Sequence, residues 1–444
     1  MPLVLLLVGG VITLMTGGIQ IQRFPIACRM VFRSMKGDNA GEGTITQFQA
    51  LSTALASTVG NGNIGGVATA ILIGGPGAIF WMWVCAAVGM ATKYAEAVLG
   101  VHHRVTRETG ELASGPMYYI TGGISHVVTG KTLATLFAFF GACAALLGTG
   151  NMAQSNTIAR TFVEAARTIG GVEVPMWVPG LLITVSVGLV LLGGIRRIAA
   201  VAERIVPAMI VLYLVSTSTY LMLNVSQVPE VLALIVSQAF SPAAAVGGFA
   251  GASMAQAIAA GVSRGVLSNE AGLGTAPIAH GIAKVSHPVD QGLVGIFEVF
   301  IDTIVICSIT SFVILTSGLW TDPAFQNASG DLTAAALSTT IPFASLIVAV
   351  CSFLFGFSTL IGWCYYGEKC VEFLFGSSII TTYRIAFTML IMIGSVASVP
   401  LVWALGTLLN GLMALPNLVG LLFLVGTVRK LTHDYFSKGA SASI

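Results

Sequence analysis

The stretch STVGNGNIGGVATA at residues 57–70 lies inside an apolar run that extends from residue 44 to residue 71. A run of this length crosses a bilayer, which takes about 20 residues. Glycine and asparagine at its centre disfavour a regular helix at membrane depth, where every backbone N–H and C=O group needs a partner inside the protein. The pattern predicts an interrupted transmembrane helix that lines a site. Close packing through small residues is the alternative; it explains Gly65 and Gly66 but not the asparagines.

The composition indicates an all-α polytopic membrane protein. Of the 444 residues 55% are hydrophobic and 9% are charged, against roughly 25% charged residues in soluble proteins. The net charge is +2 and the basic residues are scattered, so we expect no nucleic-acid partner. Seven cysteines without metal-ligand spacing are interpreted as small buried hydrophobic residues.

Charge-free runs predict eleven spans and their orientation. The expected spans are 1–21, 44–71, 76–99, 132–158, 177–194, 205–224, 243–262, 291–318, 343–367, 379–398 and 401–427. With the N-terminus outside, 18 of the 20 Lys and Arg residues fall on the cytoplasmic side, as the positive-inside rule requires. We therefore expect a protein of the cell (inner, cytoplasmic) membrane whose C-terminus faces the cytoplasm. Residues 1–21 lack a basic leader and are interpreted as a retained span.

A second interrupted span is expected, because secondary transporters are often built from inverted repeats with breaks at matching places. The segment SPAAAVGGFAGASMAQAIAAGV at residues 241–262 has glycines on both sides of Phe249. In the fourth span, Asn151 and Gln154 share one helical face. Phe249, Ser253 and Gln154 are therefore the candidates for contacts with the side chain and amino group of a substrate.

Two further polar pairs lie at membrane depth. Glu298 and Asp302 are four residues apart on one face of the eighth span. An intramembrane carboxylate is a functional hypothesis by default, although a helix-packing hydrogen bond is the interpretation we favour for Glu298. In the ninth span the hydroxyls of Ser358 and Thr359 offer lone pairs to a cation, unless they bond back to their own helix.

Three stretches carry a family resemblance. GGPGAIFWMWVCAAVGM at residues 74–90, SRGVLSNEAGLGTAP at 263–277 and FGFSTLIGWCYYGEK at 355–369 resemble the sodium:alanine (alanine/glycine:cation) symporter family of the amino acid–polyamine–cation superfamily. The resemblance implies the leucine-transporter-type fold, a five-plus-five inverted repeat with one extra N-terminal helix. The implied parts are the extra helix at 1–21, the repeats at 44–224 and 243–427, and a cytoplasmic tail at 428–444.

The resemblance also implies a ligand set, because VGNGN at residues 59–63 matches the V-G-x-G-N break of that fold. The backbone around Gly60, Asn61 and Gly62 would meet the substrate carboxylate. Two Na⁺ sites are implied as well. Their expected ligands are Asn63 with the Thr58 carbonyl at one site, the Ala56 and Val59 carbonyls with Ser358 and Thr359 at the other, and Asp302 as a further ligand.

The predicted function is import of a small neutral amino acid, alanine or glycine, by symport with Na⁺ through alternating access. A larger substrate such as glutamine, H⁺ coupling and a passive channel remain as alternatives. An enzyme is not expected, since no H-E-x-x-H pair and no Ser/His pairing within spans occur. No protein partner is implied. We interpret SNEAGLGTAP at residues 268–277 as a structured inner loop, with a contact between Arg264 and Glu270 in one conformation.

Overall fold

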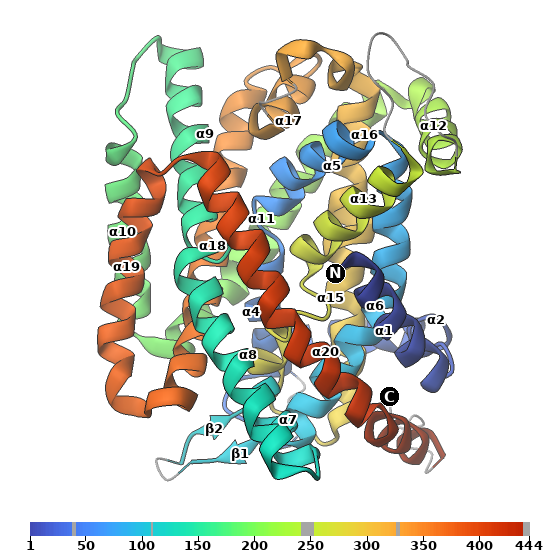
Figure 1. Ribbon diagram of the computed structural model, residues 1–444. Coiled ribbons are helices and arrows are strands. Elements are labelled where there is room, and N and C mark those ends of the chain that lie inside the picture. The colour runs from blue at the N-terminus through green and yellow to red at the C-terminus, as the bar shows by residue number, and fades with distance from the viewer. Residues whose placement is uncertain (38–40, 108–109, 241–252, 326–328, 438–444) are drawn as a thin grey trace.

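The protein is almost entirely helical (Figure 1). The computed structural model describes residues 1–37, 41–107, 110–240, 253–325 and 329–437. Within these ranges seven helical stretches are long and apolar enough to cross a membrane. They are Gly77–His102, Val127–Gly170, Gly194–Leu223, Pro288–Ser317, Ala344–Phe375, Ser377–Val396 and Leu401–Ser437. Four shorter apolar helices accompany them, so the all-α polytopic class is confirmed, whereas the number of eleven spans stays a prediction.

The first half of the chain runs as far as α12. Its helices are α1 (Pro2–Met15), α2 (Ile19–Gln22), α3 (Phe24–Met35), α4 (Gln47–Thr58), the π-helical η1 (Gly62–Gly66), α5 (Val67–Gly74), α6 (Gly77–His102), α7 (Pro116–Gly123), α8 (Val127–Leu147), α9 (Met152–Gly170), α10 (Trp177–Leu191), α11 (Gly194–Leu223), η2 (Val225–Gln227) and α12 (Val228–Phe240). Strands β1 (Val105–Thr106) and β2 (Leu112–Ala113) pair antiparallel near α7 (Figure 1).

The second half begins at α13. Its helices are α13 (Met254–Asn269), α14 (Ala276–His280), α15 (Pro288–Val299), the π-helical η3 (Phe300–Cys307), α16 (Ser308–Ser317), η4 (Leu319–Thr321), η5 (Pro323–Phe325), α17 (Ser329–Ser338), α18 (Ala344–Phe375), η6 (Ser377–Ile379), α19 (Ile380–Val396) and α20 (Val399–Ser437). In Figure 1 α20 crosses the front of the molecule, and α17 lies at the end opposite to α7.

Breaks in the backbone make two of the expected spans differ from the observed helices. The first ends at Met15, because Gly17 and Gly18 adopt left-handed backbone angles that stop a right-handed helix. The fourth, expected at 132–158, extends over residues 127–170 and is interrupted between Leu147 and Met152. This interruption was not foreseen, and it brings Thr149 into the middle of the molecule.

Helix α6 is surrounded by other helices. It packs against α13 and α15, and α14 lies along it as well. Helix α4 packs on α11, α18 and α14, whereas α5 packs on α13. Figure 1 shows α5 and α13 near each other in the upper part of the molecule. The two halves of the first interrupted helix therefore have different neighbours.

A fully buried charge cluster joins α6, α14 and α15. The Lys93 ammonium lies 3.1 Å from one carboxylate oxygen of Glu298, and His280 Nε2 lies 2.9 Å from the other. Gln291 contacts the second ring nitrogen of His280. Glu298 thus serves helix packing, as the sequence analysis favoured. His280, which lies between the expected spans 243–262 and 291–318, is completely buried.

We expect Glu298→Gln to destabilise the protein, because it leaves the buried Lys93 ammonium without its counter-charge. Breaking a buried pair costs about 3–5 kcal/mol, so the apparent melting temperature in detergent should fall by roughly 5 °C or more. The control is Glu230→Gln, which alters an exposed glutamate on α12. Equal melting temperatures for both variants would contradict the structural role of the cluster.

Candidate functional site

The first break lies where α4 gives way to η1. A capping box of Thr46 and Gln49 starts α4, and the helix ends at Thr58. The carbonyl groups of Ala56, Thr58 and Val59 accept no hydrogen bond from any described residue. These free groups follow from the helix end, where the last carbonyls lose their partners. They are the three carbonyls that the sequence analysis expects to bind Na⁺.

The other side of this break presents amide groups. The Gly62 N–H donates no hydrogen bond to the part of the chain that the structure describes. The Gly60 N–H donates to Asn63 Oδ1 at 2.8 Å. Asn61 donates through its backbone and side chain to Gln154 Oε1, and its own Oδ1 accepts from Ser352. Gly60, Asn61 and Gln154 are therefore brought together as predicted.

A second break lies beside the first, and its position corrects the sequence analysis. Residues 268–277, expected to form an inner loop, are buried between α13 and α14. Glu270, Gly272 and Gly274 adopt left-handed backbone angles, with φ of 57°, 90° and 83°. Three such residues within five cannot continue a right-handed helix. Helix α13 packs on η1 and α14 packs on α4, so the two breaks face each other.

The expected second break and its candidate Phe249 stay predictions. The glycines at 247, 248 and 251 and Phe249 lie outside the described residues. Ser253 is exposed and caps α13, since its hydroxyl accepts from the Gln256 N–H. Serine followed three residues later by glutamine is a helix-start signature, and that local role accounts for Ser253. The structure thus gives Ser253 a capping role, and its contact with a substrate stays a prediction.

A small cavity lies between the two breaks, and residues from α4, η1, α9, α13, α18 and α20 contribute to it. Its lining consists of Ser57, Thr58, Gly60, Gly62, Thr149, Gln154, Leu267, Glu270, Thr359, Trp363 and Trp403. Five of the predicted residues therefore surround one space: Thr58, Gly60, Gly62, Gln154 and Thr359. The indole rings of Trp363 and Trp403 line the same space. Glu270 and Thr149 come from interruptions that the sequence pattern does not reveal, whereas Trp403 lies in the expected span 401–427, where no polar pattern marks it as a site residue.

Asp302 lies in a buried polar cluster behind the first break. Its carboxylate accepts from Asn63 Nδ2 at 2.7 Å, from Ser268 Oγ at 2.9 Å and from Thr303 Oγ1 at 2.7 Å. It belongs to the π-helical η3, a kind of irregularity that is frequent at functional sites. Asn63 and Asp302, which the sequence analysis gave as separate Na⁺ ligands, are in direct contact. Ser268, which was missed, joins them from the second break.

The hydroxyls of Ser358 and Thr359 both donate to the Phe355 carbonyl of their own helix. This is the back-bonding that the sequence analysis left open, and it leaves the lone pairs of each oxygen available. Thr359 faces the first break, since a Cβ atom added at Gly60 would lie 2.6 Å from its Oγ1. Ser358 points toward Met209 on α11.

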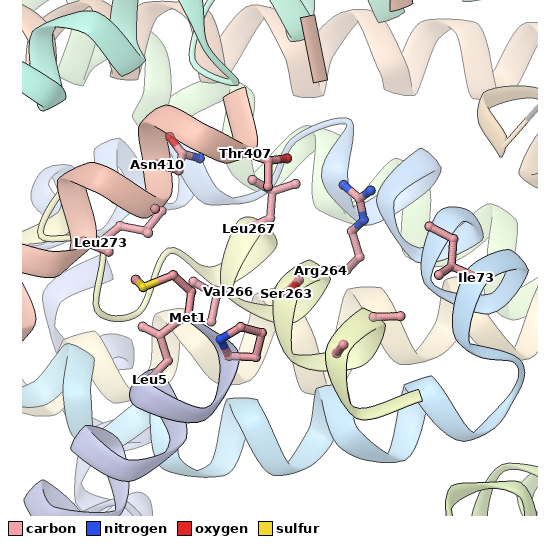
Figure 2. A pocket seen from close by; sticks show the side chains of 15 residues that line it. Met1, Leu5, Ile73, Ser263, Arg264, Val266, Leu267, Leu273, Thr407 and Asn410 are labelled. Carbon is pink, nitrogen blue, oxygen red and sulfur yellow. The ribbon is translucent and has the colours of Figure 1, made fainter. Parts of the chain in front are cut away.

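A second cavity adjoins the first along α13 and α20 (Figure 2). It has a volume of about 330 Å³ and mostly apolar walls from α1, α5, α13 and α20, with Arg264 and Asn410 among its few polar residues. Leu267 borders both cavities. The Arg264 guanidinium lies over the Trp403 ring, 5.7 Å from its centre. The expected contact between Arg264 and Glu270 is not formed, because Glu270 instead accepts from Trp363 and Thr275.

Known proteins resemble this chain over nearly its whole length. The model of the sodium:alanine symporter family matches residues 1–443. The chain is similar to the sodium/alanine symporter AgcS of Methanococcus maripaludis, with 47% identity over 98% of this chain and 93% of the relative. It is also similar to the probable sodium/glutamine symporter GlnT of Bacillus subtilis, with 40% identity over 88% of this chain and 79% of the relative.

Solved structures share the fold at low sequence identity. A manganese transporter of Eremococcus coleocola matches with a TM-score of 0.53 and 14% identity, over 86% of this chain and 79% of the other. A Na⁺-coupled sialic acid symporter matches with a TM-score of 0.51 and 12% identity, over 95% of this chain and 86% of the other. The relatives identify an integral membrane protein that is a cation-coupled amino-acid symporter, with Na⁺ as the coupling ion, and not an enzyme. The chain belongs to the sodium:alanine symporter family.

Proposed function

We propose that the protein imports a small neutral amino acid, alanine or glycine, together with Na⁺ through alternating access. The observation that carries this proposal is the pair of facing breaks around one small cavity. Two indole rings, Trp363 and Trp403, line that cavity and leave little room for a large side chain. The relationship to a sodium/alanine symporter supports the same substrate.

The substrate carboxylate is proposed to lie at the amide side of the first break. The free Gly62 N–H and the positive end of the helix that starts there attract an anion. Gly60 and Asn61 complete this wall, and Gln154 holds Asn61 in position through two hydrogen bonds. Asn63 accepts a hydrogen bond from the Gly60 N–H and therefore connects these amide groups to the first proposed Na⁺ site.

Two Na⁺ positions follow from the free oxygen atoms. At the first, the Thr58 carbonyl, Asn63 and Asp302 are the proposed ligands, and the Ser268 hydroxyl lies within the same cluster. At the second, the carbonyls of Ala56 and Val59 face the helix that carries Ser358 and Thr359. All proposed Na⁺ ligands are neutral oxygen atoms except the Asp302 carboxylate. In this arrangement Na⁺ and the amino acid are bound side by side.

Coupling follows from linkage between the two ligands. Each is proposed to stabilise the occluded form more than the open forms, so each raises the affinity of the other by the same factor. The membrane potential supplies energy, since moving one charge through 100 mV is worth about 2.3 kcal/mol. Rocking of one helix bundle against the other would open the cavity to each side in turn.

We also propose the inverted-repeat arrangement, with repeats at 44–224 and 243–427, an extra helix at 1–21 and a cytoplasmic tail at 428–444. The pairing of α4 with α14 and of α5 with α13 supports it, because two broken helices that run in opposite directions pair in this crossed way. The distribution of Lys and Arg supports an outer N-terminus.

The decisive experiment is uptake of labelled L-alanine by proteoliposomes under an inward Na⁺ gradient. We expect accumulation above equilibrium with Na⁺ and none with K⁺ or H⁺ gradients. L-Glutamine is tested in parallel, since one relative carries a name for glutamine transport. Accumulation of glutamine but not alanine would overturn the substrate, accumulation driven by H⁺ would overturn the ion, and equilibration without accumulation would indicate a passive channel.

Thr359→Ala should raise the Na⁺ concentration needed for half-maximal alanine uptake by about 10-fold, because it removes one oxygen ligand from the second Na⁺ position. Its matched control is Thr217→Ala on α11. Both threonines are buried and both donate to the carbonyl four residues earlier, but Thr217 lies outside the cavity lining. If the two variants show the same Na⁺ dependence, Thr359 does not bind the ion.

A further inference from the structure

Glu270 has an unusual backbone for its residue type. It is one of two non-glycine residues with positive φ among the described residues, and its side chain lines the cavity between the breaks while only 2% of the residue is exposed. A left-handed non-glycine residue persists only where the surrounding structure enforces it, and such residues cluster at functional sites. The backbone angle directs attention to what its carboxylate contacts.

The contacts of the Glu270 carboxylate are all neutral. Trp363 Nε1 donates to Oε1 at 2.7 Å, Thr275 Oγ1 donates to Oε2 at 2.6 Å, and Ser57 Oγ lies 3.4 Å from Oε2. No Lys, Arg or His side chain in the described ranges forms an ion pair with it. Lys93 is engaged by Glu298 instead. A buried carboxylate of this kind is costly unless a positive charge comes to it.

The backbone around Glu270 also favours a cation. At the end of α13 the carbonyls of Leu267, Ser268 and Asn269 accept no hydrogen bond from the described parts of the chain. The C-terminal end of α4, with its own free carbonyls, faces them across the same cavity. Helix C-termini carry partial negative charge. Two helix ends and one carboxylate therefore present negative potential to the cavity, and the Gly62 N–H provides the donor side.

We propose that Glu270 binds the α-ammonium group of the amino-acid substrate. The inference rests on the proposed function and names the residue by which the site distinguishes an amino acid from other small carboxylates. An ammonium group suits this position, because its three N–H donors can reach the Glu270 carboxylate and the free carbonyls at the two helix ends together. With the carboxylate held at Gly62, the two charged groups of an amino acid meet opposite charges across the cavity.

The test compares L-alanine with L-lactate, which carries a hydroxyl in place of the ammonium. Inhibition of labelled L-alanine uptake by each compound is measured in proteoliposomes for the wild type and Glu270→Gln, and the ratio of the two inhibition constants is the readout. The wild type should prefer alanine by at least about 100-fold, because ammonium–carboxylate hydrogen bonds are strong. In Glu270→Gln the ratio should fall at least about 10-fold, with the Na⁺ concentration for half-maximal uptake unchanged.

The control is Glu96→Gln. Glu96 is also a buried glutamate held by neutral donors, Asn417 Nδ2 at 2.7 Å and the Gly274 N–H at 3.0 Å, but it does not line the cavity. In Glu96→Gln the ratio of the two inhibition constants should stay within about two-fold of the wild-type ratio. This comparison separates the general effect of losing a buried carboxylate from the loss of the ammonium partner. An unchanged ratio in folded Glu270→Gln would overturn the inference.

Glu270→Asp keeps the negative charge but shortens the side chain. It is the variant to test if Glu270→Gln does not fold. We expect the KM for alanine to rise at least about 5-fold while the Na⁺ dependence stays as in the wild type. A wild-type KM in this variant would overturn the assignment of Glu270. Absence of Na⁺-driven alanine uptake by the wild type itself would instead overturn the proposed function, so the two failures are distinguishable.

Discussion

The need to satisfy buried backbone groups is the constraint on which this structure depends. Two helices stop side by side, and each leaves carbonyl groups without partners at its C-terminal end. In water such groups would be hydrated, but at membrane depth they need ligands. The breaks are fixed by residues that a regular helix does not favour, notably Gly60 at the first and Glu270 at the second. The proposed site for cations and for a zwitterion is therefore a consequence of the backbone path itself.

The charged side chains divide into two groups around these breaks. Lys93, His280 and Glu298 neutralise one another away from the cavity and connect α6, α14 and α15. Glu270 and Asp302 are instead held by neutral donors at the breaks. This separation gives the protein one cluster that maintains packing and, beside the proposed ligand positions, the carboxylates of Glu270 and Asp302. In a Na⁺-coupled symporter those ligands arrive and leave together, so the free carboxylates are suited to coupling their binding.

The sequence pattern predicts the first break, but it does not indicate the break that the structure describes at Glu270. Glycine and asparagine in the middle of a long apolar run are unmistakable, and Gly60, Asn61 and Gln154 meet as expected. Symmetry predicts a break in the glycine cluster at 247–251, which lies outside the described residues, whereas the break that the structure describes follows α13 at Glu270, in a polar segment with the composition of a loop. Local composition does not reveal burial, and burial is what turns that segment into part of a site. Ser253 illustrates the same limit, because its sequence fits a pocket residue as well as a helix cap, and the structure shows the cap.

The central claim is that Na⁺ and the amino acid occupy adjoining parts of one site and strengthen each other's binding. Equilibrium binding of labelled L-alanine to the purified protein in detergent, measured over a series of Na⁺ concentrations at constant ionic strength, tests it without any contribution from a membrane gradient. The account predicts that the Kd for alanine falls steeply as Na⁺ replaces choline, and that alanine raises the affinity for Na⁺ by the same factor. A Kd for alanine that does not change with Na⁺ would contradict it.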